Sequence, residues 1–293
     1  MQTVKIGSTV ALTGSVVPGN TWIRGNVYTG QLAASAVSTV PGTMFNTSRP
    51  AALVNSTGFF QTAVPPTYSE FDISQVVNVK NVAGSPVAGD GSTDDTASLQ
   101  AILNASKGKV VYFPYGTYVL TDSLIIPPGS RLFGEAWSKF TPKGSKFMDA
   151  RNPRAMIKVG NPGDIGVAQM TDFLFTAASN LPGATLVEVH MAGEKPGDVG
   201  FFNTHFWIAS GTIRTCAHFK PTASVYLENS WATSQSGGGS NPGAAVGFLV
   251  ESRNGTWIVG MGSGKSSITR PFQILIQATD GILSEKNITS YTR

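Results

Sequence analysis

Few residues in this sequence are of types that do chemistry, and the densest group of them is acidic. Asp90, Asp94 and Asp95 lie within residues 89–96, a stretch that two glycines interrupt. Closely spaced carboxylates can bind calcium, but beside the start of a helix they accept hydrogen bonds from free backbone N–H groups. Apolar residues then recur at helical spacing as far as Leu103. We therefore predict a short α-helix here and interpret the three aspartates as helix and turn caps rather than calcium ligands.

Histidine and glutamate supply the remaining candidates for acid–base chemistry. His205 lies between Thr204 and Phe206 on an alternating stretch, where it is either a base or a packed, hydrogen-bonded side chain. Glu228 and Glu251 are either catalytic acids or hydrogen-bonded residues at corners of the chain. We favour the structural role for all three and keep the catalytic role open.

The sequence contains little that indicates a cofactor. The single cysteine, Cys216, excludes an intramolecular disulfide, and we expect a buried thiol. No spacing of histidine, cysteine and acidic residues indicates a metal site. The Gly-Ser-Gly-Lys sequence at 262–265 lacks the spacing of a phosphate-binding loop, and no helix is predicted after it. We therefore expect neither a metal nor a cofactor.

Composition excludes several classes of function. Only 13% of the 293 residues are charged, and the net charge of +4 includes no basic run, so we expect no nucleic-acid partner. No apolar run approaches the roughly 18 residues of a membrane span. Residues 1–17 lack the pattern of a signal peptide, which favours an intracellular location, whereas the N-x-S/T sequons indicate a secreted ancestry.

The elements that must position these residues are strands. After the predicted helix, short alternating apolar runs follow one another, separated by Gly, Pro and Asn, and two of them cover 167–175 and 202–208. We predict an all-β fold, a right-handed, single-stranded parallel β-helix with a short N-terminal capping α-helix. A β-sandwich is the rival, but it requires more tight hairpin turns than this sequence offers.

Two regions are expected along the chain. Residues 1–70 are predicted to form a few strands followed by an extended linker that packs on the main domain, because periodicity disappears after residue 30. Residues 71–293 are predicted to form the β-helix. Four tryptophans could line a surface for stacking sugars, but core packing accounts for most of them equally well: Trp137, Trp207, Trp231 and Trp257.

Two motifs resemble a known superfamily. Gly-Asp-Gly-x-Thr-Asp-Asp-Thr at 89–96 and the stretch 109–118 look like the start of the pectate-lyase-type β-helix. Further stretches are similar to the fungal exo-β-1,3-glucanases of glycoside hydrolase family 55: residues 126–138, 159–167, 203–206, 223–229 and 249–252. The resemblance covers residues 25 to 280 approximately, which corresponds to the second of that family's two side-by-side β-helices. It implies a truncated relative without the first lobe and its half of the cleft.

The resemblance also implies where catalytic acids would lie. Inverting hydrolysis of a glycoside requires a protonated carboxyl group and a second group that positions water. Gly264 stands at the position of one family glutamate, and Thr279 stands at the position of the general acid. Asp280 comes one residue late, and a shift of one residue on a strand reverses the direction of the side chain.

Three functions remain open from the sequence. We favour a β-helix that has been recruited for small-molecule chemistry of the isomerase or cyclase type on its exposed face, with Asp280, His205 and Glu251 as candidate catalytic residues. The alternatives are a reduced but active β-1,3-glucan hydrolase and a non-catalytic carbohydrate-binding protein. The expected partners are a small molecule or a β-glucan oligosaccharide, without a membrane. A homodimer is expected through the face that a missing lobe would expose.

Overall fold

The computed structural model describes residues 63–209, 211–234 and 243–252 and, outside these ranges, the strands named below and turns at residues 8 and 56–57. The chain forms two compact units, Met1–Gln61 and Thr62–Arg293. The predicted boundary at residue 70, and the packing of the first region on the second, stay predictions.

The first unit contains antiparallel strands. β1 (Val4–Ile6) pairs with β2 (Thr9–Leu12), and β3 (Asn20–Tyr28) pairs with β4 (Val37–Asn46). The strands before residue 30 were expected, but β4 lies where the sequence shows no alternation. β4 pairs with β3 along its whole length, and these backbone hydrogen bonds do not require alternating side chains.

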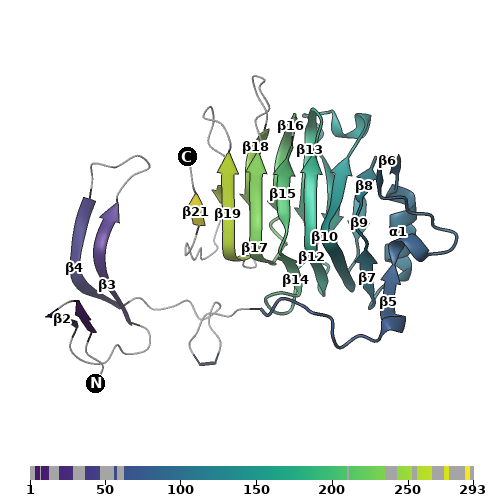
Figure 1. Cartoon of the computed structure of the whole chain (residues 1–293). Helices are drawn as coiled ribbons and strands as arrows, with labels where there is room; N and C mark the ends of the chain where they lie inside the picture. Colours follow the sequence, from purple (N-terminus) through teal and green to yellow (C-terminus); the bar gives the residue numbers. More distant parts are fainter. Residues whose placement is uncertain are drawn as a thin grey trace. The chain divides into compact units, whose positions relative to one another are not determined.

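The second unit consists of three columns of parallel strands, and Figure 1 shows its successive coils side by side. The first column contains β5 (Val76–Asn78), β7 (Val110–Phe113), β14 (Val199–Phe202) and the first parts of β10 (Ser130–Pro142), β12 (Ala168–Ala177), β17 (Val225–Ser234) and β19 (Thr256–Lys265). The second column contains β6 (Asp90–Asp94), β8 (Thr117–Leu120), β15 (His205–Ile208), β21 (Ile288–Ser290) and the later parts of β10, β12, β17 and β19. The third column contains β9 (Leu124–Ile126), β11 (Arg154–Val159), β13 (Leu181–Val189), β16 (Thr212–Phe219), β18 (Gly243–Val250) and β20 (Ile274–Ile276).

This arrangement confirms the predicted parallel β-helix. Each pairing among the described strands of the second unit is parallel, for example Ser130 with Ala168 and Leu132 with Met170. A sandwich built from hairpins would show antiparallel neighbours instead. Three strands per coil explain why the sequence contains so many short apolar runs at irregular intervals.

Polar side chains mark the corner between the first and second columns. Asp172, Asn203 and Asn229 adopt left-handed backbone conformations, with φ of 62°, 51° and 49°. Asn203 Nδ2 donates to Asp172 Oδ1 at 3.1 Å, and Asn229 Nδ2 donates to Asn203 Oδ1 at 2.6 Å. The single strand predicted over 202–208 is therefore two strands, β14 and β15, because Asn203 turns the chain at a position where Asn tolerates positive φ.

The interior of the coils is a ladder of aromatic rings. Neighbouring rings contact one another at centroid distances between 5.0 and 6.3 Å, and each side chain is 2% exposed or less. The members are Phe113, Phe140, Phe173, Phe175, Phe206 and Phe248. Such pairs add to the free energy gained by burying the rings. The ladder connects successive coils along the axis of the helix.

The predicted cap is α1 (Thr96–Ala105), which lies at one end of the β-helix in Figure 1. Its apolar face is buried, and Gln100 binds the edge strand β9 as another strand would. Gln100 Nε2 donates to the Ile125 carbonyl at 3.0 Å, and Gln100 Oε1 accepts from the Ile125 N–H at 2.8 Å. The edge that α1 covers therefore cannot pair with another chain at this point. In the described part of the chain, no helix is both long and apolar enough to cross a membrane.

Asp94 caps α1 and Asp90 caps a turn before it, as predicted, whereas Asp95 makes no side-chain hydrogen bond to the helix. Asp90 Oδ1 accepts from the backbone N–H groups of Ser92 and Thr93 at 2.8 Å each, and Asp94 Oδ1 accepts from the N–H of Thr96 at 3.0 Å. Asp95 is fully buried at the N-cap position of α1. Its carboxylate accepts from the preceding loop, at 2.7 Å from the Ala88 N–H and 3.0 Å from the Gly89 N–H.

We expect Asp95→Ala to lower the free energy of unfolding by about 3 kcal/mol, because two N–H groups lose a charged acceptor in a buried place. Urea denaturation of the full chain measures this change. Glu194→Ala is the control, because Glu194 is exposed. Equal stability of the two variants would contradict the structural role of Asp95.

Candidate functional site

Five polar side chains meet on the outer face of the third column. His190 Nε2 lies 2.6 Å from Glu188 Oε1, and Lys220 Nζ lies 3.3 Å from Glu188 Oε2. His218 connects the two carboxylates, because its Nε2 lies 2.6 Å from Glu251 Oε2 and its Nδ1 lies 3.7 Å from Glu188 Oε2. We call these five residues the His218 cluster.

The register of the third column brings the cluster together. Glu188 on β13 is the direct partner of His218 on β16. His190 and Lys220 follow two residues later in their respective coils, so their side chains point to the same face. The backbone N–H of Glu251 donates to the carbonyl of Phe219 at 2.8 Å and places Glu251 at the next coil.

The charges of the cluster follow from burial and from its hydrogen bonds. Burial opposes the ionisation of Glu188, but the bonds and charges of His190 and Lys220 outweigh it and lower the pKa of Glu188 to about 2. Burial lowers the pKa of His218, although the bond to Glu251 acts in the opposite direction. An ionised carboxylate beside an imidazole is an arrangement suited to general acid–base chemistry.

The structure separates the residues that the sequence suggested. Glu251 belongs to the His218 cluster. His205 lies on the second column instead, where its Nε2 is 2.8 Å from Thr233 Oγ1 and burial lowers its pKa. Asp280 lies outside the described residues. The predicted trio is therefore not brought together in the part of the chain that the structure describes.

Sequence reasoning missed Glu188, His190 and His218. The signal available was a repeated pair of polar residues two positions apart at the ends of two apolar runs: Glu188 with His190, and His218 with Lys220. Without the register of the coils, these pairs are indistinguishable from ordinary solvent-exposed positions of alternating strands.

The structure also places Glu228 and Cys216. Glu228 Oε2 accepts from the Tyr226 hydroxyl at 2.8 Å, and its structural role stays a prediction. Cys216 is fully buried, and burial raises the pKa of its thiol, as expected for a structural cysteine. Among the described residues, no group of three or more His, Cys, Asp and Glu residues is placed to hold a metal ion.

A second candidate site lies on the outer face of the second column. Trp231 on β17 is 49% exposed, so core packing does not account for it. It is in register with His205 on β15 and with Gly262 on β19. Thr233 is similarly in register with Trp207 and with Gly264.

The two partners on β19 are glycines, so no side chain of theirs stands beside the exposed indole. Gly262 adjoins Trp231, and Gly264 adjoins Thr233. We call Trp207, Trp231, Gly262 and Gly264 the tryptophan shelf. A flat ligand can approach the strand backbone there while it contacts the indole.

Comparison with known proteins gives a family match and several relatives. Residues 77–180 match the family described as rhamnogalacturonase A/epimerase, pectate lyase-like. The chain is 35% identical over 248 residues to the glucan endo-1,3-beta-glucosidase BGN13.1 of Trichoderma harzianum, covering 74% of this chain and 32% of that protein. It is 34% identical over 211 residues to a glucan 1,3-beta-glucosidase of Cochliobolus carbonum, covering 71% of this chain and 26% of that protein. Among solved structures, an iota-carrageenase complexed to iota-carrageenan fragments matches 64% of this chain and 48% of its own chain, with a TM-score of 0.34 and 13% identity.

The parallel coils define the chain as a parallel β-helix protein, and residues 77–180 of it match a pectate-lyase-like family. More narrowly, it is homologous over most of its length to proteins named glucan 1,3-β-glucosidases, which confirms the resemblance seen in the motifs. The chain spans about a third of the length of these relatives.

We expect Glu188→Gln to lower the free energy of unfolding by about 2 kcal/mol at neutral pH. The folded-state pKa of Glu188, about 2, lies below its ordinary value of 4.5, so the ionised side chain stabilises the fold above pH 4.5. This stabilisation is lost as the pH falls towards 2, and the difference between the two proteins should shrink in that range.

Urea denaturation of both proteins across this pH range tests the prediction. Glu194→Gln is the matched control, because Glu194 is exposed. A difference that stays constant with pH would mean that the ionised carboxylate is not what stabilises the cluster.

Proposed function

We propose that this protein binds β-1,3-glucan on the tryptophan shelf. The observation that carries the proposal is the exposure of Trp231, 49%, on a coil whose outward neighbours on β19 are glycines. The homologous proteins named glucan 1,3-β-glucosidases favour a glucan as the ligand.

The shelf offers the contacts that a sugar chain needs. One face of a glucosyl ring is lined by C–H groups and packs well on an indole, whereas its edges carry hydroxyl groups. His205 and Thr233 lie beside Trp231 and form a hydrogen bond of 2.8 Å that can rearrange towards a ligand hydroxyl. A few polar groups around an apolar surface are typical of sites that fix the orientation of a ligand.

Hydrolysis by the mechanism of the resembled family is not part of this proposal. Gly264, on the shelf, stands where the motif resemblance places one glutamate, and Thr279 stands where it places the general acid. A glycine can neither donate a proton to a leaving oxygen nor activate water. The shelf therefore favours binding over cleavage.

The small-molecule chemistry predicted from the sequence remains a second candidate, because the His218 cluster supports it. Glu251 and Glu188 flank one imidazole, and His218 can move a proton between a bound substrate and a carboxylate. Such a relay suits isomerisation or cyclisation as well as hydrolysis. The predicted homodimer also stays a prediction, and light scattering tests it.

We expect Trp231→Ala to weaken the binding of laminarin at least tenfold, because the stacking surface is removed. Isothermal titration calorimetry with laminarioligosaccharides measures the change. Tyr115→Ala is the matched control, because Tyr115 is an aromatic residue with 62% exposure outside the shelf. Equal affinity of Trp231→Ala and the unmodified protein would overturn the proposal.

We expect the unmodified protein to release no glucose from laminarin above background. Measurement of reducing ends over a day tests this, with Asp280→Asn and Glu251→Gln as companions. Turnover that Asp280→Asn abolishes would show that an active hydrolase has been retained. Turnover that only Glu251→Gln abolishes would assign hydrolysis to the His218 cluster.

A further inference from the structure

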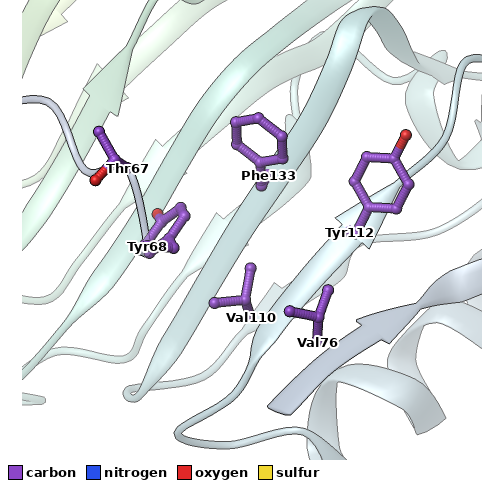
Figure 2. A pocket seen from close by; sticks show the side chains of 6 residues that line it. All are labelled: Thr67, Tyr68, Val76, Val110, Tyr112 and Phe133. Atoms are coloured by element: carbon purple, nitrogen blue, oxygen red, sulfur yellow. The ribbon is translucent and has the colours of Figure 1, made fainter. Parts of the chain in front are cut away.

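A pocket of about 240 Å³ lies on the outer face of the first column, away from the shelf and from the His218 cluster. Figure 2 shows its walls, which come from β5, β7 and β10 and from the segment that precedes β5. The lining residues are Thr67, Tyr68, Val76, Val110, Tyr112 and Phe133. None of the six carries a charge, so the pocket is suited to a neutral ligand.

Aromatic rings form two sides of the pocket. Tyr112 and Phe133 are direct partners on β7 and β10, and their rings stack at 6.2 Å with an interplanar angle of 27°. Tyr68 meets Phe133 edge to face at 6.3 Å. A ligand with a flat, apolar face can pack against these rings.

Tyr68, which forms one wall of the pocket, has an unfavourable backbone conformation. Tyr68 has φ of 55°, whereas the other non-glycine residues with positive φ in the described ranges are aspartate or asparagine. Bulky residues rarely adopt this conformation, and they keep it where the surroundings impose it. Tyr68 is only 8% exposed, and its carbonyl accepts from the N–H of Phe71 at 3.1 Å.

The hydroxyl of this strained residue is also unsatisfied. Tyr68 and Thr171 carry buried hydroxyls that make no hydrogen bond of normal geometry. Burial raises the pKa of Tyr68 to about 12, and the nearby Thr171 hydroxyl acts in the opposite direction. Buried polar groups without partners are uncommon and recur at functional sites. Backbone strain and a buried hydroxyl without a normal hydrogen bond therefore coincide at Tyr68, which lines the pocket.

Polar groups are also available among the lining residues. Burial and the neighbouring Glu135 carboxylate, to which the hydroxyl donates, raise the pKa of Tyr112, so its hydroxyl stays protonated and would have to exchange Glu135 for a ligand. The Thr67 hydroxyl lies 3.3 Å from the Ser69 hydroxyl and can likewise turn to a ligand. Rings with hydroxyls beside them suit a molecule with C–H groups on its face and hydroxyls on its edge.

We propose that this pocket binds one neutral pyranose ring as a subsite separate from the tryptophan shelf. Its volume is below the range of about 300 to 1,000 Å³ that holds drug-sized ligands, which favours a single ring over an oligosaccharide. The identity of that ring as a glucosyl unit rests on the proposed function. The two sites share no residue, so they can be tested independently.

The experiment uses the full chain in a Trp231→Ala background, which removes the shelf. The probes are methyl β-glucoside, its charged counterpart methyl β-glucuronide, and phenol as a planar aromatic ring. Ligand-observed NMR titration measures the affinity for each. Val76→Phe fills the pocket, and Val64→Phe is the matched control, because Val64 is 85% exposed and does not line it.

We expect Trp231→Ala to bind methyl β-glucoside at least tenfold more tightly than methyl β-glucuronide or phenol. Adding Val76→Phe should reduce the glucoside affinity at least tenfold, and adding Val64→Phe should leave it unchanged. Tyr112→Phe keeps the ring, removes one hydroxyl and should weaken binding several-fold, which provides a test if Val76→Phe does not fold.

The proposal is overturned if Trp231→Ala binds no glucoside, if neither Val76→Phe nor Tyr112→Phe changes the affinity, or if phenol or the glucuronide binds as tightly. If the tryptophan shelf does not bind glucan, the result is different, because Trp231→Ala would then retain full affinity for laminarin. The two outcomes are therefore distinguishable.

Discussion

The parallel register between coils is the constraint on which the rest of the structure depends. Hydrogen bonds between parallel strands hold each residue beside one fixed partner in the next coil, as Glu188 is held beside His218 and Tyr112 beside Phe133. Inside, this register aligns the phenylalanine ladder. Outside, it aligns side chains that are 21 to 30 residues apart in sequence, and each of the three surface features described above is produced in this way.

The fold must also protect the edge that its first coil exposes and turn its corners. The amide of Gln100 occupies both hydrogen-bonding groups of Ile125 at the edge of β9, so α1 protects that edge without itself being a strand. At the corner between the first two columns, the row of Asp172, Asn203 and Asn229 adopts positive φ, which costs these residue types little free energy. This polar row also determines where β15 and the later part of β17 begin, and therefore where His205 and Trp231 lie.

The scaffold keeps three chemically different surface features apart. The His218 cluster contains charged groups, the tryptophan shelf contains an exposed indole beside two glycines, and the pocket beside Tyr68 is lined by uncharged residues. These features lie on three different columns. A β-helix tolerates such separation because outward side chains contribute little to its core, so its surface can change while the inward ladder is kept.

The sequence by itself determined the type of coil, its cap and its ancestry. Alternating runs, the capping aspartates and the motifs at 89–96 and 126–138 are local patterns, and local hydrogen bonding and burial suffice to explain them. Only the tertiary structure decided which polar residues meet. His205 and Glu251 looked like partners in sequence, but they lie on different columns, whereas Glu188, His190 and His218 converge because β13 and β16 pair in register. The exposure of Trp231 was likewise undetermined, because alternation shows that successive side chains point to opposite faces but does not show which face is covered.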